Sequence, residues 1–84
     1  MLDDKKINTH IDAVMAGFRA MYELREKPHF EFGCIAPVLT EDEINVFDDL
    51  IAVRIINEFN IYVSIGYESR FLIINVSDNF EDIE

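Results

Sequence analysis

The stretch from Thr40 to Asn60, TEDEINVFDDLIAVRIINEFN, most constrains the fold because it carries the clearest helix-start signal in the chain. Thr40 followed three positions later by Glu43 forms a capping box, in which each side chain accepts a hydrogen bond from the other residue's backbone N–H. The acidic residues 41–43 also suit the positive end of the helix dipole. The sequence therefore predicts a helix that begins after Thr40 and runs to about Phe59.

This predicted helix is apolar on two sides. At 100° per residue, one face carries Ile44, Phe47, Ile51, Ile55 and Phe59, and the nearly opposite face carries Val46, Leu50 and Val53. A helix of this kind is normally buried between two layers or lies at an oligomer interface. A narrow polar strip, formed by Asp42, Asn45 and Asp49, is left to contact water or a partner.

A first amphipathic helix is predicted from about Asp4 to Leu24. Pro28 prevents the helix from extending further, because a residue that precedes a proline is disfavoured in the α-helical conformation. Its apolar stripe consists of Ile7, Ile11, Val14, Met15, Phe18, Met21 and Tyr22. Beside the stripe lies a flank of small side chains: Ala13, Ala16, Gly17 and Ala20. Small side chains permit close approach of another backbone, so we expect this flank to pack against the second apolar face of the helix that starts after Thr40.

Three strands complete the predicted fold. Residues 29–35 alternate, with Phe30, Phe32 and Cys34 on one side. Residues 61–76 read as a hairpin that turns at Glu68 and Ser69, with Tyr67 opposite Arg70, Ile65 opposite Leu72, Val63 opposite Ile74 and Ile61 opposite Val76. The other face of the hairpin carries Tyr62, Phe71 and Ile73. This face is a candidate dimer surface, partner site or seat of the first helix.

These elements predict an α+β fold of two layers in the order α-β-α-β-β, with a three-stranded sheet, a C-terminal β-hairpin and two helices on one face. Residues 1–77 are expected to form a single domain and residues 78–84 a flexible acidic tail. A chain of 84 residues, half of them hydrophobic, is sufficient for one small core.

Charge is distributed unevenly. Residues 1–28 hold five acidic and five basic residues, whereas residues 29–84 hold twelve acidic residues and two basic ones, which accounts for the whole net charge of −10. Such a surface repels nucleic acid and anionic membranes and attracts basic proteins. The single cysteine, Cys34, excludes an intramolecular disulfide, and no apolar segment predicts a signal peptide or membrane span. We therefore expect a cytoplasmic protein that binds neither nucleic acid directly nor a membrane.

No motif for catalysis, a cofactor or a metal is present. His10 and His29 are the only histidines, and neither is matched with a nucleophile and an orienting third group. One cysteine and two separated histidines do not make a zinc site, and residues 41–43 lack the pattern of a calcium loop. The sequence therefore predicts a protein that is not an enzyme. A small enzyme would be reconsidered only if a pocket joined a histidine to several carboxylates.

The acidic residues lead to the first functional hypothesis, a small binding protein that inhibits or regulates a basic, nucleic-acid-handling protein, with DNA mimicry as its narrowest form. The candidate contacts are Glu41, Asp42, Glu43, Asp48, Asp49, Glu68, Asp78, Glu81 and Asp82. Electrostatic attraction would accelerate association with such a partner. The simpler interpretation is that these residues cap and solvate a helix and keep the chain soluble.

In size, acidity and expected fold class, the chain resembles the phage or mobile-element inhibitors that mimic DNA, and the acidic immunity proteins and antitoxins that neutralise basic nucleases. The resemblance is one of general character and rests on no shared motif. The alternative hypothesis is a homodimeric structural or assembly subunit, or an antitoxin- or immunity-type protein, in which acidity only confers solubility. Tyr62, Phe71 and Ile73 would then form the interface.

Overall fold

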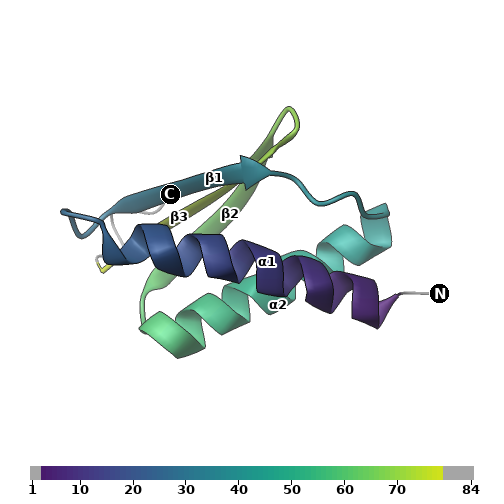
Figure 1. Cartoon of the computed structure of the whole chain (residues 1–84), viewed down its shortest axis with the longest axis horizontal. Coiled ribbons are helices and arrows are strands. Elements are labelled where there is room, and N and C mark those ends of the chain that lie inside the picture. Colours follow the sequence, from purple (N-terminus) through teal and green to yellow (C-terminus); the bar gives the residue numbers. More distant parts are fainter. Residues whose placement is uncertain (1–2, 79–84) are drawn as a thin grey trace.

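The computed structural model describes residues 3–78 of the chain. Its elements are helix α1 (Asp4–Glu23), strand β1 (Phe30–Ile35), helix α2 (Glu41–Phe59), strand β2 (Tyr62–Glu68) and strand β3 (Phe71–Ser77). Both helices lie on the same side of a three-stranded antiparallel sheet (Figure 1). The predicted two-layer α+β fold is therefore confirmed. Of the predicted tail, only Asp78 lies within the described residues.

Side-chain caps define where the helices begin. In α1 the Asp3 carboxylate accepts a hydrogen bond from the backbone N–H of Lys6 at 3.0 Å. In α2 the Thr40 hydroxyl accepts from the Glu43 N–H at 3.2 Å, and Glu43 Oε1 accepts from the Thr40 N–H at 3.0 Å. The capping box is thus confirmed. The helix ends at Phe59 because Asn60 adopts a left-handed conformation, with φ 53° and ψ 50°.

The sheet has the order β1-β3-β2, so the last strand is central. In the β2–β3 hairpin, Tyr67 lies opposite Leu72 and Ile65 opposite Ile74. The predicted register, with Tyr67 opposite Arg70, is therefore wrong by two residues, and the loop consists of Ser69 and Arg70. Because the shift is an even number, every side chain keeps its predicted face. Ser69 accommodates the tight turn with a positive φ of 56°.

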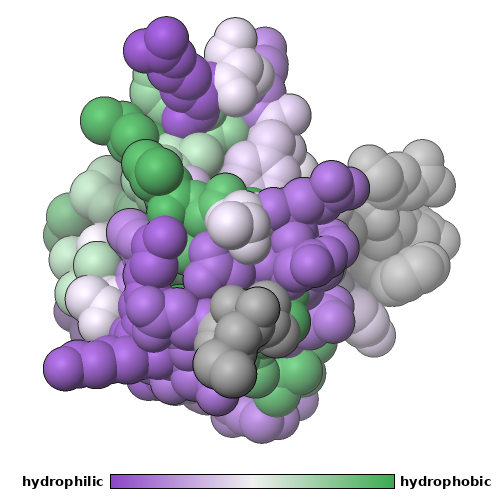
Figure 2. All heavy atoms as spheres, turned by 90° about the vertical axis from the view of Figure 1, so that its right-hand side faces the viewer, coloured by the Kyte–Doolittle hydropathy of each residue, from purple (hydrophilic) through white to green (hydrophobic). Residues whose placement is uncertain are grey.

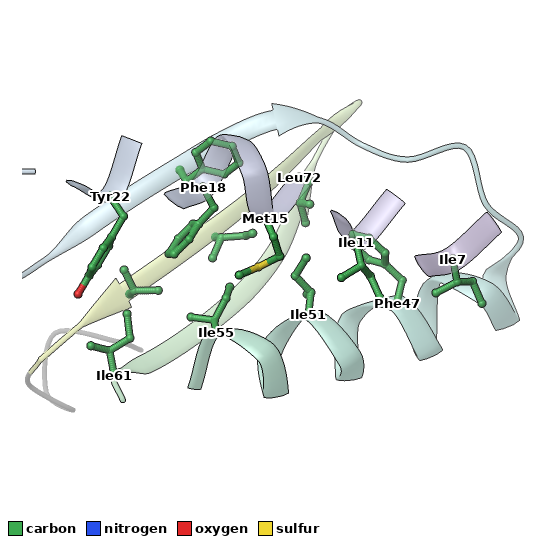
Figure 3. Close-up of a cluster of buried hydrophobic side chains, with 13 residues drawn as sticks. Ile7, Ile11, Met15, Phe18, Tyr22, Phe47, Ile51, Ile55, Ile61 and Leu72 are labelled. Atoms are coloured by element: carbon green, nitrogen blue, oxygen red, sulfur yellow. The ribbon is translucent and has the colours of Figure 1, made fainter. Parts of the chain in front are cut away.

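The core fills the space between the helices and the inner face of the sheet. Phe18 of α1 lies in an aromatic cluster, with its ring centroid 5.4 to 5.8 Å from those of Tyr22, Phe30, Phe32 and Phe59. From α2, Phe47, Ile51 and Ile55 are fully buried. Figure 3 shows side chains of both helices pointing into this common interior. The first apolar face predicted for α2 is therefore the one that forms the core.

The second apolar face of α2 is covered only at Val46, which is partly buried against the core. For its other two residues, the prediction that α1 packs on this face is wrong. Leu50 is 41% exposed and Val53 is 52% exposed. The flank of small side chains on α1 faces solvent and strand β1 instead. Ala13, Ala16 and Ala20 are exposed, and a Cβ atom added at Gly17 would lie 3.2 Å from Phe32 Cζ of β1. Helix α1 also does not pack on the sheet face that carries Tyr62 and Phe71, because both helices lie on the opposite face of the sheet (Figure 1).

Candidate functional site

Glu43 does not belong to the accessible acidic surface, because its side chain is used inside the fold. The residue is 4% exposed. Its carboxylate accepts hydrogen bonds from the backbone N–H groups of Thr40 and, at 3.3 Å, Asp3, and lies 3.7 Å from Lys6 Nζ. These groups, led by the Thr40 N–H, hold its pKa below the ordinary value. Glu43 therefore joins the starts of the two helices and is withdrawn from the predicted partner contacts.

Asp48 is also engaged within the chain. Its Oδ1 accepts a hydrogen bond of 2.6 Å from the Tyr67 hydroxyl, which links α2 to the end of β2. Desolvation raises the pKa of Asp48, the Tyr67 hydrogen bond opposes this, and the neighbouring Asp49 charge adds to it. The pKa of Tyr67 is raised as well, mainly by desolvation and then by Asp48. Of the two carboxylate oxygens of Asp48, Oδ1 is therefore engaged within the fold.

Two further carboxylates are neutralised along the line where α1 and α2 meet. Arg19 donates from two nitrogens to the Glu58 carboxylate, one of these bonds being 2.8 Å long. Arg54 Nη1 donates to Asp12 Oδ1 at 2.9 Å. Hydrogen bonding to Arg19 lowers the pKa of Glu58. The bases of this region are therefore matched to acids of the opposite helix, and this line presents no excess of negative charge.

The accessible acidic surface is the outer side of the first half of α2, comprising Glu41, Asp42, Asn45 and Asp49; we call it the acidic strip. All four residues are exposed. Among residues 3–78, neither Asp42 nor Asp49 forms an ion pair. Figure 2 shows the end of the molecule where both helices begin, and hydrophilic residues cover most of it. The acidic strip therefore starts on a polar end of the molecule and continues along α2.

Of the remaining predicted contacts, the two that the structure describes, Glu68 and Asp78, do not join the acidic strip into one surface. Glu68 is exposed at the end of β2, beside Arg70 of the hairpin loop. Asp78 directly follows β3, which ends on the side of the molecule away from the starts of the helices (Figure 1), and it lines a shallow pocket of about 310 Å³ with Arg25, Glu26, Lys27 and Pro28. Glu81 and Asp82 lie outside the described residues. Of the seven predicted acids within residues 3–78, the structure thus brings together three, Glu41, Asp42 and Asp49.

The outer face of the sheet carries aromatic and aliphatic side chains, as the strand alternation predicted. Tyr62 is 49% exposed and Phe71 is 51% exposed, while Ile73 is partly buried. Sequence reasoning missed Ile35, which is opposite Phe71 in the β1–β3 register and 77% exposed. The signal was present, because the inward set of β1 is Phe30, Phe32 and Cys34, and the alternation places Ile35 on the outer face.

The groove that brings a histidine near the cysteine does not hold a catalytic constellation. This groove of about 280 Å³ between α1 and β1 includes His10 and Cys34, but its other lining residues are Ala13, Val14, Gly17, Phe32, Ile35 and Pro37, and no carboxylate is among them. Desolvation raises the pKa of the Cys34 thiol, which disfavours the reactive thiolate. Among residues 3–78, no three His, Cys, Asp or Glu side chains are grouped to hold a metal ion.

Comparison of the chain with models of known protein families gave no match, and neither the curated proteins nor the solved structures gave one. Neither α1 nor α2 is long and apolar enough to cross a membrane.

Proposed function

We propose that this protein is a small acidic binding protein that inhibits or regulates a basic, nucleic-acid-handling protein. The observation that carries the proposal is the contrast between carboxylates with internal partners and those without. Glu43, Asp48 and Glu58 are bonded within the fold, whereas Asp42 and Asp49 are exposed and form no ion pair among the described residues. A carboxylate that is not paired within the chain keeps its negative charge available to attract a basic surface of another protein.

The geometry favours recognition of a basic protein surface over close mimicry of a phosphate row. Asp42 and Asp49 are seven residues apart, which corresponds to about 10 Å along a helix. One DNA strand has a charge about every 3.4 Å along the axis. The acids of the acidic strip, adjacent at Glu41 and Asp42 and then about 10 Å further along at Asp49, are therefore not evenly spaced like the phosphates of a nucleic-acid strand. DNA mimicry in the narrow sense would need further acids, such as those of residues 78–84.

The proposal is tested by capturing partners on the immobilised protein, identifying them, and competing the captured protein with duplex DNA. We expect a basic partner whose binding weakens steeply with added salt and is displaced by DNA. The double change Asp42→Lys and Asp49→Lys should weaken binding at least tenfold. The matched control is Glu23→Lys with Glu26→Lys, which changes the net charge equally at the end of α1. An equal loss of affinity in both variants would show that binding depends only on net charge, and would contradict the assignment of the contact to the acidic strip.

The alternative proposal, a homodimeric assembly subunit, is favoured by a separate observation. Ile35 and Phe71 are opposite each other on the outer sheet face, and each is more than half exposed. Together with Tyr62 and Ile73 they form the apolar surface that a dimer would cover. Light scattering over a range of concentrations tests this. A dimer that Phe71→Ser converts to a monomer would favour the assembly role, and a monomer at all concentrations would exclude it.

A further inference from the structure

Beside the acidic strip, the outer face of α2 carries large apolar side chains that the fold leaves uncovered. Leu50 is 41%, Val53 is 52% and Ile56 is 45% exposed. We call these three residues the apolar ridge. Their spacing of three residues places them on successive turns of one side of the helix. Apolar side chains exposed next to one another on one element mark a candidate interaction surface.

The acidic strip and the apolar ridge form one continuous face. Asp49 lies one residue before Leu50 and four before Val53, so the two sets meet in the middle of α2. From Asp42 to Ile56 the face spans fifteen residues, and its ends are about 21 Å apart along the helix. Its first half attracts cations, and its second half offers apolar area to bury. A partner that matches both halves must carry basic side chains opposite the acidic strip and apolar side chains opposite the apolar ridge.

We infer that the outer face of α2 binds a basic amphipathic helix of the partner protein. The partner helix would place aliphatic side chains on the apolar ridge and Lys or Arg side chains beside Asp42 and Asp49. A helix of about fifteen residues has the required length, and two helices can pack along each other by fitting side-chain ridges into grooves. This inference rests on the proposed function, because it names the part of the basic partner that is recognised.

Charge complementarity selects this occupant over a second copy of the chain. Each copy carries a net charge of −10, so a dimer formed through this face would bring two strongly acidic surfaces together. A basic helix instead neutralises Asp42 and Asp49 while it covers Val53 and Ile56. Attraction by the acids increases the association rate, and burial of the aliphatic side chains slows dissociation.

The test uses two synthetic peptides of eighteen residues with the same composition of leucine and lysine. One is arranged as an amphipathic helix, and the other is scrambled so that it has no apolar face. Each is titrated into the isotopically labelled full-length protein at low and high salt, with amide shifts recorded by NMR. We expect the amphipathic peptide to bind at least tenfold more tightly, with the largest shifts between Asp49 and Ile56.

Two variants assign the contact. Val53→Ser with Ile56→Ser should weaken binding of the amphipathic peptide at least tenfold. Met21→Ser should leave it unchanged, because Met21 is 50% exposed but lies on α1. Thermal unfolding followed by circular dichroism confirms that each variant is folded.

Three results would overturn the inference. Equal binding of both peptides, unaffected by the Val53 and Ile56 changes, would mean that the contact is only electrostatic, and the proposed function would stand. A dimer that these two changes dissociate would assign the face to a second copy. Absence of binding at low salt would remove the amphipathic helix as the ligand, while partner capture would still judge the proposed function independently.

Discussion

The two faces of α2 contain the same kinds of residues but have different roles in the fold. On the inner face, Phe47 and Ile51 are fully buried, and Glu43 at the edge accepts two backbone N–H bonds. On the outer face, Val53 is 52% exposed, and Asp42 has no ion-pair partner among the described residues. The inner face is explained by the stability of the fold. The outer face contributes little to it, so a binding role is best sought there.

The largest expected difference between the faces is in the cost of truncating an apolar side chain. Ile51→Ala should reduce the free energy of unfolding by about 2 to 5 kcal/mol, because it opens a cavity in the core. Val53→Ala and Leu50→Ala should each cost less than about 1 kcal/mol, because both side chains already contact water. Urea denaturation at neutral pH measures all three. A cost at Val53 close to that at Ile51 would show that the outer face is covered in solution.

Hydrophobic periodicity explains why the buried face of α2 could be predicted from the sequence. The spacing of Phe47, Ile51 and Ile55 identifies residues that share a face, and the capping box at Thr40 and Glu43 marks where the helix begins. Periodicity does not reveal which of two apolar faces a neighbouring element will cover. That depends on where α1 docks, and α1 packs against the sheet and the inner face of α2. The exposure of Val53 could therefore not be predicted from the sequence.

The hairpin register shows a similar limit. Alternation determines which side chains share a face, but it permits any shift by an even number of residues. The observed register places Tyr67 opposite Leu72, and Tyr67 also bonds to Asp48 of α2. That bond joins residues nineteen positions apart. Neither Tyr67 nor Asp48 carries a local signal for it, so the commitment of Asp48 to the fold could not be predicted.

The second prediction compares carboxylates on the two faces through Glu43→Ala and Asp42→Asn. Glu43→Ala should clearly destabilise the protein at pH 7, because the Thr40 and Asp3 N–H groups lose their acceptor. Asp42→Asn should have a smaller effect, because Asp42 makes no comparable bonds among the described residues. Thermal unfolding measures both, and Glu43→Gln, which keeps an acceptor oxygen, should recover part of the loss.

The pH dependence of the Glu43 variant follows from the direction of the pKa shift. The pKa of Glu43 is lower in the folded state, led by the Thr40 backbone hydrogen bond. Its stabilisation is therefore present above the unfolded-state pKa, about 4.3, and is lost as the pH falls through the folded-state value. The stability difference between the wild type and Glu43→Ala should narrow below about pH 4. A constant difference down to that range would contradict the assigned role of the Glu43 charge.

The third prediction concerns Tyr67→Phe, which removes the hydroxyl that bonds to Asp48. We expect a loss of about 0.5 to 1.5 kcal/mol, the usual net contribution of one hydrogen bond. Desolvation raises the pKa of Asp48 and the Tyr67 hydroxyl opposes this, so the variant should raise that pKa further. A raised folded-state pKa favours folding below the unfolded-state pKa, and this contribution is lost as the pH rises through the folded-state value. Carboxyl NMR titration measures the shift, and an unchanged Asp48 pKa would argue against the bond in solution.

The smallest predicted effect has the opposite sign and lies on the outer face. The charge of Asp49 raises the pKa of Asp48, which means that the two carboxylates repel each other. Asp49→Asn removes that repulsion and should stabilise the protein slightly, by about 0.5 kcal/mol or less, since Asp49 is exposed and solvent screens its charge. The gain should shrink at high salt. A loss of stability above about 0.5 kcal/mol would instead give Asp49 a structural role. An acid that lowers stability slightly, and whose removal also weakens partner binding, is better explained by recognition than by the needs of the fold.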